Sequence, residues 1–497
     1  MYVLVLTEMW ERFSFYGMRA LLIFYLTQHF LYQDAQAFVI YGSYVSLVYV
    51  TPMLGGYVAD HYLGHAKTVV FGGILMICGH LGMTFEGAAA TVTVLADGTQ
   101  GILRDEQALQ AFYLSMALLV VGVGFLSPSI YTLLGRLYPA TGHRRDVGFI
   151  FFSIGINVGG GLAAFVCGYL GMTYGWAYGF GSAGIGMCIG LLVFLFGQRY
   201  LYGLDAPAGA KKTVKVYRAM RISVEWVIYV AACLGVVIVW HVLQLGRLGG
   251  YLIVSQFVVA IGGIILYALF KLDLVERRNT FAVLSIVAAS ALFAVFIEQY
   301  GITLNLFTLR HVDLATISSD LQAPQLQGLL AVFIICTAPA VIWLINFLAN
   351  RQRNPSGFTK MAAGFVLMGL GYLTVTYGIA EAGQFGKISA VFLVLMYFIW
   401  AVADNLFIPV STSLLTRLSP ENMTGMLMGT LMLAFSVGYF GASIIAQWAA
   451  VDSESVGVDS LGRYGEFFAA MGGTAIVVGL GIYAVDGFAK KYTTATD

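Results

Sequence analysis

Three charged residues stand close together in the first apolar stretch of the chain, namely Glu8, Glu11 and Arg12. Their spacing of three and four positions places them on one face of a helix. A charge at the centre of a membrane helix costs at least about 2.5 kcal/mol, so such residues are kept where they face a cavity and pair. Carboxylates bind and release protons, and a guanidinium holds a carboxylate through two parallel hydrogen bonds. The segment predicts charges that face a cavity and pair there, with an interfacial structural salt bridge near the inner membrane face as the alternative.

Other kinds of chemistry find little support in the sequence. Gly159 to Gly161 are expected to allow close helix packing, because no strand precedes them as a phosphate loop requires. The cysteines are odd in number and form no CxxC pair, so we expect buried free thiols at Cys78, Cys167, Cys188, Cys233 and Cys336. No metal site is predicted, and the chain is not expected to be an enzyme.

The composition shows what surrounds these charges. The chain has 497 residues, of which 59% are hydrophobic and 10% are charged, and its formal net charge is +1. Soluble proteins carry about 25% charged residues. The high apolar content excludes disorder, and the lack of a basic surplus argues against nucleic-acid binding. We therefore expect most of the surface to face lipid.

Fourteen apolar runs, from 3–30 to 464–488, are each long enough to cross a bilayer as a helix. With the N-terminus inside, the inner loops hold 19 of the 26 basic residues and the outer loops hold five. Basic loops stay in the cytoplasm. Both termini are therefore predicted to be cytoplasmic, and the stretch 88–108 is expected to be a solvated loop outside.

The runs predict an all-α polytopic membrane protein with three parts. Residues 1–197 form an N-terminal six-helix bundle, 198–279 hold linkers and an inserted two-helix hairpin, and 280–497 form a C-terminal six-helix bundle. Two bundles of six with a central cytoplasmic connection are the arrangement of major facilitator transporters.

Four motifs resemble those of one transporter family. The segment EMWERFSFYG, 8–17, is similar to the motif ExxERFxYYG, with Phe15 in place of the first tyrosine. The other matches are GGYVADHYLG at 55–64, SIGINVGG at 153–160 and IEQYGITLNLF at 297–307. The chain thus resembles the proton-dependent oligopeptide transporter (POT/PTR) family of the major facilitator superfamily, in its bacterial fourteen-helix branch.

The resemblance implies a role for each matching residue. Arg12 would receive the peptide carboxylate, and Glu8 and Glu11 would take part in proton coupling. Glu298 would meet the peptide amino group, couple to the proton, or pair with Arg19 at an outer gate. The remaining matches are the substrate-contacting residues Tyr16, Tyr49 and Asn157, and Asp60, which would pair with a neighbouring helix end at a gate.

Four positions of the implied substrate site depart from the family. Ser127 stands where the family has a lysine, and Asp404 stands where it has a glutamate. Leu330 and Leu431 replace an asparagine and a tryptophan. Without the lysine, Asp404 is expected to take part in proton coupling; the alternative is that Asp404 and Asn405 only pack between helices.

These features predict a proton-coupled symporter that imports di- and tripeptides across the bacterial inner membrane by alternating access. The expected coupling ion is the proton, with no organic cofactor, and the expected functional form is a monomer. The departures at Ser127, Leu330 and Leu431 leave open a different small amphipathic organic solute. A membrane sensor that transports nothing is the alternative from another class.

Overall fold

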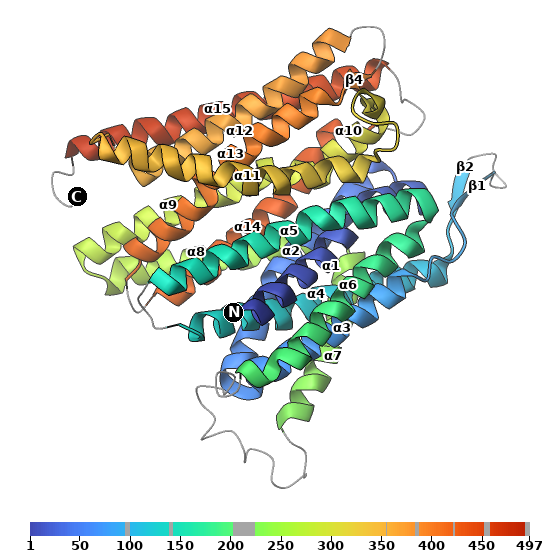
Figure 1. Ribbon diagram of the computed structural model, residues 1–497, viewed down its shortest axis with the longest axis horizontal. Coiled ribbons are helices and arrows are strands. Elements are labelled where there is room, and N and C mark those ends of the chain that lie inside the picture. Colours follow the sequence, from blue (N-terminus) through green and yellow to red (C-terminus); the bar gives the residue numbers. More distant parts are fainter. Residues whose placement is uncertain are drawn as a thin grey trace. The chain divides into compact units, whose positions relative to one another are not determined.

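The structure, a computed structural model, describes residues 1–94, 100–138, 143–201, 224–353, 355–382, 387–420, 423–451 and 458–492. Within these ranges thirteen helical segments are long and apolar enough to cross a membrane. Helix α1, Tyr2–Phe24, adds a fourteenth: its 23 residues extend about 35 Å, although four of them are charged. The predicted fourteen membrane helices are thereby confirmed, and the chain is a multi-pass membrane protein (Figure 1).

The described helices group into two compact units, Met1–Tyr32 with Gln36–Ile253, and Gln33–Ala35 with Val254–Asp497. The first unit contains α1, α2 (Asp34–Val58), α3 (His65–Met83), α4 (Glu106–Arg136), α5 (His143–Tyr174), α6 (Trp176–Gly197) and α7 (Val224–Gln244). The boundary falls inside α8 (Arg247–Lys271), which follows α7 after a short turn.

The second unit contains the remaining helices. They are α9 (Leu274–Ile297), α10 (Thr303–His311), α11 (Ala323–Asn350), α12 (Gly357–Ala382), α13 (Val391–Leu418), α14 (Thr424–Ala446) and α15 (Val458–Tyr492). Its core is rich in aromatic side chains, with Phe293 stacked on Phe407 at 4.0 Å between ring centroids. Short strands β3 (Val312–Asp313) and β4 (Ile388–Ser389) pair in parallel.

Helix α1 lies against α5 and α6 in the first unit (Figure 1). Glycines allow this approach at the level of the charged segment. A Cβ added at Gly190 of α6 would lie 2.9 Å from the Cβ of Trp10, and one at Gly159 of α5 would overlap the carbonyl of Met9. Small residues let membrane helices approach closely. The packing role predicted for the 159–161 glycines is therefore confirmed at Gly159.

The second unit contains a broken membrane helix. Helices α9 and α10 lie within a single apolar span, Leu274–His311, but a tight turn at Glu298–Gly301 separates them. Ile302 leaves the helical conformation with φ −114° and ψ −93°. The apolar pattern runs through this point, so only the glycine at 301 indicates a break in the sequence.

Two expectations about exposed segments need correction. In the stretch 88–108 the described strands are largely exposed, as expected, but β1 (Thr91–Val94) and β2 (Gln100–Leu103) pair antiparallel instead of forming an irregular loop, and the β-branched residues of β1 favour this pairing. Cys78, Cys233 and Cys336 are free but exposed rather than buried. They lie on α3, α7 and α11, at positions that no other part of the described chain covers.

Candidate functional site

The predicted charge cluster on α1 forms in the first unit. Nε of Arg12 lies 3.0 Å from Oε1 of Glu8 and 2.6 Å from Oε2 of Glu11. Both glutamates are fully buried and Arg12 is 9% exposed. The two carboxylates therefore share one guanidinium, and the cluster carries one negative charge in excess when both are ionised.

Ser127 of α4 completes this cluster. Its Oγ accepts a hydrogen bond from Nη2 of Arg12 at 2.8 Å and donates one to Oε1 of Glu11 at 3.3 Å. The sequence placed Ser127 at the lysine position of the family, and the structure brings its hydroxyl into contact with the charges. A hydroxyl supplies hydrogen bonds to both partners, but it does not supply the positive charge of a lysine.

Aromatic side chains cover the arginines of α1. The guanidinium carbon of Arg12 lies 5.6 Å from the ring centre of Phe15, and that of Arg19 lies 5.6 Å from the ring centre of Tyr16. Nε of Arg19 donates to the hydroxyl of Tyr41 at 2.7 Å. Tyr41 was not foreseen, because its position on α2 matched none of the motifs.

Asn157 and Asp60, two other predicted residues of the first unit, make contacts of their own. Tyr49 of α2 is partly exposed, and Asn157 of α5 donates to the carbonyl of Ser153 in its own helix at 3.0 Å. Asp60 pairs with His65 at 3.3 Å and with Arg136 at 3.8 Å, and Arg136 is the last residue of α4. The expected pairing of Asp60 with a neighbouring helix end is thus present.

The break in the second unit positions Glu298. This residue is 1% exposed and begins the turn between α9 and α10. The neighbouring Gln299 holds the turn in place, because its Nε2 donates to the carbonyl of Ala442 in α14 at 3.0 Å. Its Oε1 accepts from the hydroxyl of Thr303 at 2.8 Å, across the break. The sequence predicted no role for Gln299, because Glu298 is the only charged residue of the motif at 297–307.

Asp404 lies on α13 of the same unit and is partly exposed. Among the described residues its carboxylate has no hydrogen bond or ion pair. Its neighbour Asn405 donates to the carbonyl of Ile334 and to the hydroxyl of Thr337, both at 3.0 Å, and so joins α13 to α11. The packing role considered for this pair therefore applies to Asn405. Leu330 of α11 and Leu431 of α14 are 6% and 0% exposed.

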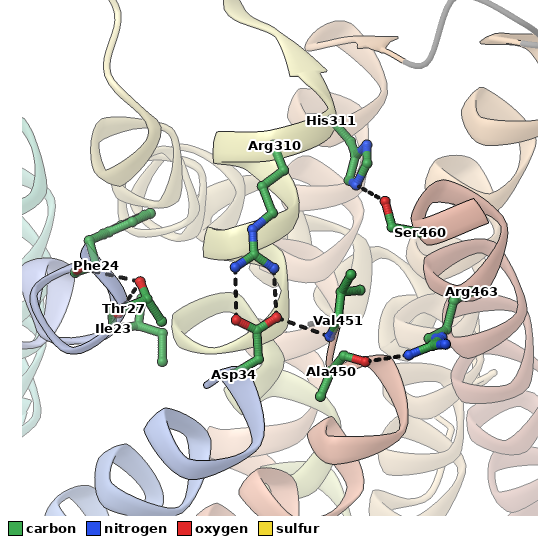
Figure 2. A network of polar contacts seen from close by, with 10 residues as sticks. All are labelled: Ile23, Phe24, Thr27, Asp34, Arg310, His311, Ala450, Val451, Ser460 and Arg463. Carbon is green, nitrogen blue, oxygen red and sulfur yellow. Dashed lines mark hydrogen bonds and ion pairs between the residues drawn. The ribbon is translucent and has the colours of Figure 1, made fainter. Parts of the chain in front are cut away.

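A polar network that sequence reasoning missed also lies in the second unit (Figure 2). Arg310 of α10 donates to both carboxylate oxygens of Asp34, at 2.6 and 2.8 Å. Asp34 is 3% exposed and also accepts from the backbone nitrogen of Val451 at 3.1 Å. The two charges are 276 positions apart, and no local pattern connects them.

The predicted residues thus fall into two groups. The first unit holds Glu8, Glu11, Arg12, Tyr16, Arg19, Tyr49, Asp60, Ser127 and Asn157, and the second holds Glu298, Leu330, Asp404 and Leu431. The structure brings Glu8, Glu11, Arg12 and Ser127 into direct contact. A pair between Arg19 and Glu298 would join the two units, and it stays a prediction.

Comparison with known proteins covers most of the chain. Residues 66–465 match the POT family. The peptide transporter YePEPT of Yersinia enterocolitica is 29% identical over 458 residues, 89% of this chain and 86% of that protein. A di-/tripeptide transporter of Lactococcus lactis is 27% identical over 490 residues, 95% of this chain and 92% of that protein.

A solved structure of a peptide transporter also matches most of the chain. The crystal structure of a peptide transporter POT in complex with sulfate superposes with a TM-score of 0.78 at 27% identity. The match covers 98% of this chain and 94% of that one. The similarity therefore extends over both units of the fold.

Proposed function

The chain belongs to the POT family of the major facilitator fold, and from this premise we propose that it is a proton-coupled symporter of small peptides. It imports di- and tripeptides across the inner membrane by alternating access, with the proton as coupling ion and no organic cofactor. It acts as a transporter rather than an enzyme, and a monomer suffices. Both termini face the cytoplasm.

The buried cluster on α1 carries this proposal. Glu8 and Glu11 are fully buried in a membrane helix and share the single guanidinium of Arg12. Charges placed there are costly and are retained in membrane proteins for ion or substrate pathways. Two carboxylates around one cation can take up a proton without leaving an isolated charge, and this is the change that coupling requires.

Uptake of labelled dialanine into proteoliposomes tests the proposal. An inward proton gradient should drive accumulation, and collapse of the gradient with a protonophore should abolish it. Glu11→Gln should uncouple uptake from the gradient, because the amide cannot exchange a proton. Exposed Glu106, which accepts from Gln110 at 2.7 Å, provides the control Glu106→Gln, and this variant should transport normally. Gradient-independent uptake by the unmodified protein would contradict proton coupling.

A different amphipathic organic solute is the second possibility. It is favoured by one observation, the buried leucines at 330 and 431, which make their surroundings more apolar than an amide and an indole would. In this case dialanine is not accumulated, and an apolar solute is accumulated under the same gradient. A sensor would accumulate neither.

A further inference from the structure

Two of the five N–H groups of Arg12, one on Nε and one on Nη2, are already engaged within the first unit. Its Nε contacts both Glu8 and Glu11, at 3.0 and 2.6 Å, and its Nη2 donates to Ser127 at 2.8 Å. The guanidinium therefore has two anionic neighbours before any substrate arrives. Nη1 is the one guanidinium nitrogen that takes part in none of these contacts.

The charges around Arg12 are also unbalanced, with negative charge in excess when both glutamates are ionised. Ser127 contributes a hydroxyl and no charge, so two buried carboxylates face one cation. Oε2 of Glu8 is buried and has no hydrogen-bond partner among the described residues. The next cation of α1 is Arg19, seven positions along the helix or about 10 Å away. It donates to Tyr41 at 2.7 Å.

When Glu8 and Glu11 are both ionised, a substrate carboxylate placed here would be the third carboxylate around a single guanidinium. Like charges in a poorly solvated site repel strongly. A substrate end that is uncharged or cationic avoids this repulsion. The cluster is thus better suited to an uncharged or cationic end than to an anion.

We propose that the Glu8–Glu11–Arg12–Ser127 cluster selects small peptides whose carboxyl terminus is neutralised, such as peptide amides, over peptides with a free carboxylate. This inference rests on the proposed function and names the substrate class of the same site. Ser127 is the residue that sets the preference, because a lysine there would supply the second cation and release Arg12 for a carboxylate.

Two matched probes test this preference. Alanyl-alanine amide differs from dialanine only by an amide in place of the terminal carboxylate. Each competes for gradient-driven uptake of labelled dialanine into proteoliposomes containing the unmodified protein, Ser127→Ala or Ser127→Lys. Thermal unfolding of each purified variant, with and without probe, verifies folding and reports binding independently of transport.

The unmodified protein should be half-inhibited by the amide at a concentration about tenfold lower than by dialanine, as expected for one charge-dependent contact. Ser127→Ala should keep this order, since it adds no cation, and Ser127→Lys should reverse it. Dialanine uptake with no advantage for the amide overturns the inference and leaves the proposed function standing. If neither probe is accumulated and neither shifts unfolding, both are overturned.

Discussion

At the scale of single residues, the proposed function depends on a few charges that are costly to place in a membrane. Arg12 is held by three contacts at once, to Glu8, Glu11 and Ser127. A planar guanidinium with several donors can serve all of these partners, and a point-like ammonium cannot reach them in the same geometry. The identity of this residue, and not only its charge, should therefore matter.

Arg12→Lys should lower peptide uptake by at least about tenfold, because it keeps the charge but loses the forked contacts. Initial rates of uptake into proteoliposomes provide the measurement. Arg199→Lys is the matched control, since Arg199 lies after α6 and contacts the neighbouring Tyr200. Normal transport by Arg12→Lys would show that charge alone is sufficient.

Two ion pairs with similar N–O distances should differ widely in their contribution to stability. Arg310 and Asp34 are 14% and 3% exposed, whereas Lys67 and Glu225, at 2.5 Å, are 55% and 45% exposed. Removing one partner of a buried pair costs about 3–5 kcal/mol, and an exposed pair contributes about 0.2–1 kcal/mol. Asp34→Ala should therefore destabilise the protein much more than Glu225→Ala.

Chemical unfolding of the purified variants in detergent measures this difference in free energy. The double variants Asp34→Ala/Arg310→Ala and Glu225→Ala/Lys67→Ala complete each cycle and isolate the coupling between the partners. Equal destabilisation by the two single variants would mean that burial does not strengthen the Asp34–Arg310 interaction.

At the scale of elements, the broken helix α9–α10 is the clearest specialised feature. Glu298 occupies the break, and Gln299 ties it to α14 and to Thr303. Discontinuous helices in transporters expose backbone groups and polar side chains near the middle of the membrane. Such a break needs side-chain partners, since its backbone groups leave the helical pattern in a nearly water-free environment.

Gln299→Ala should destabilise the protein by about 1–3 kcal/mol, because it leaves buried polar partners unsatisfied. It should also slow uptake, since the turn that carries Glu298 loosens. Gln256→Ala is the matched control: Gln256 lies exposed on α8 with no hydrogen bond in the described parts of the chain. Unfolding and uptake are measured on both variants, and equal effects would contradict a special role for Gln299.

At the scale of the whole molecule, charge distribution determines orientation. The basic residues are concentrated in the loops predicted to be inside, 19 against five outside. Positively charged loops resist translocation across the membrane. The segments before α4 and after α6 should consequently lie on opposite sides of the membrane.

Cysteine labelling of intact cells tests this orientation. In a variant without the native cysteines, Val92→Cys should react with a membrane-impermeant maleimide in intact cells. Tyr200→Cys should react only after permeabilisation. Val92 and Tyr200 are 58% and 69% exposed, so burial does not protect either position. Labelling of Tyr200→Cys in intact cells would show that the predicted topology is wrong.

The sequence by itself determined the helical class, the fourteen spans and the motif residues of α1. These features are local: hydropathy over about 20 residues identifies a span, and helical spacing places Glu8, Glu11 and Arg12 on one face. The same locality explains the failures. The hairpin at 91–103 and the exposure of three cysteines depend on strand pairing and on which helix faces meet lipid.

Only the tertiary structure decided which residues meet. Ser127 lies 115 positions from Arg12, and its hydroxyl reaches the guanidinium because α4 packs against α1. Arg310 donates a hydrogen bond to Asp34, which is 276 positions away in the sequence. Gln299 donates one to the carbonyl of Ala442, which is 143 positions away. Side-chain hydrogen bonds extend only about 3 Å, so partners distant in sequence are fixed by helix packing. The sequence therefore identified the charges, and the fold showed that the hydroxyl of Ser127 lies between Arg12 and Glu11.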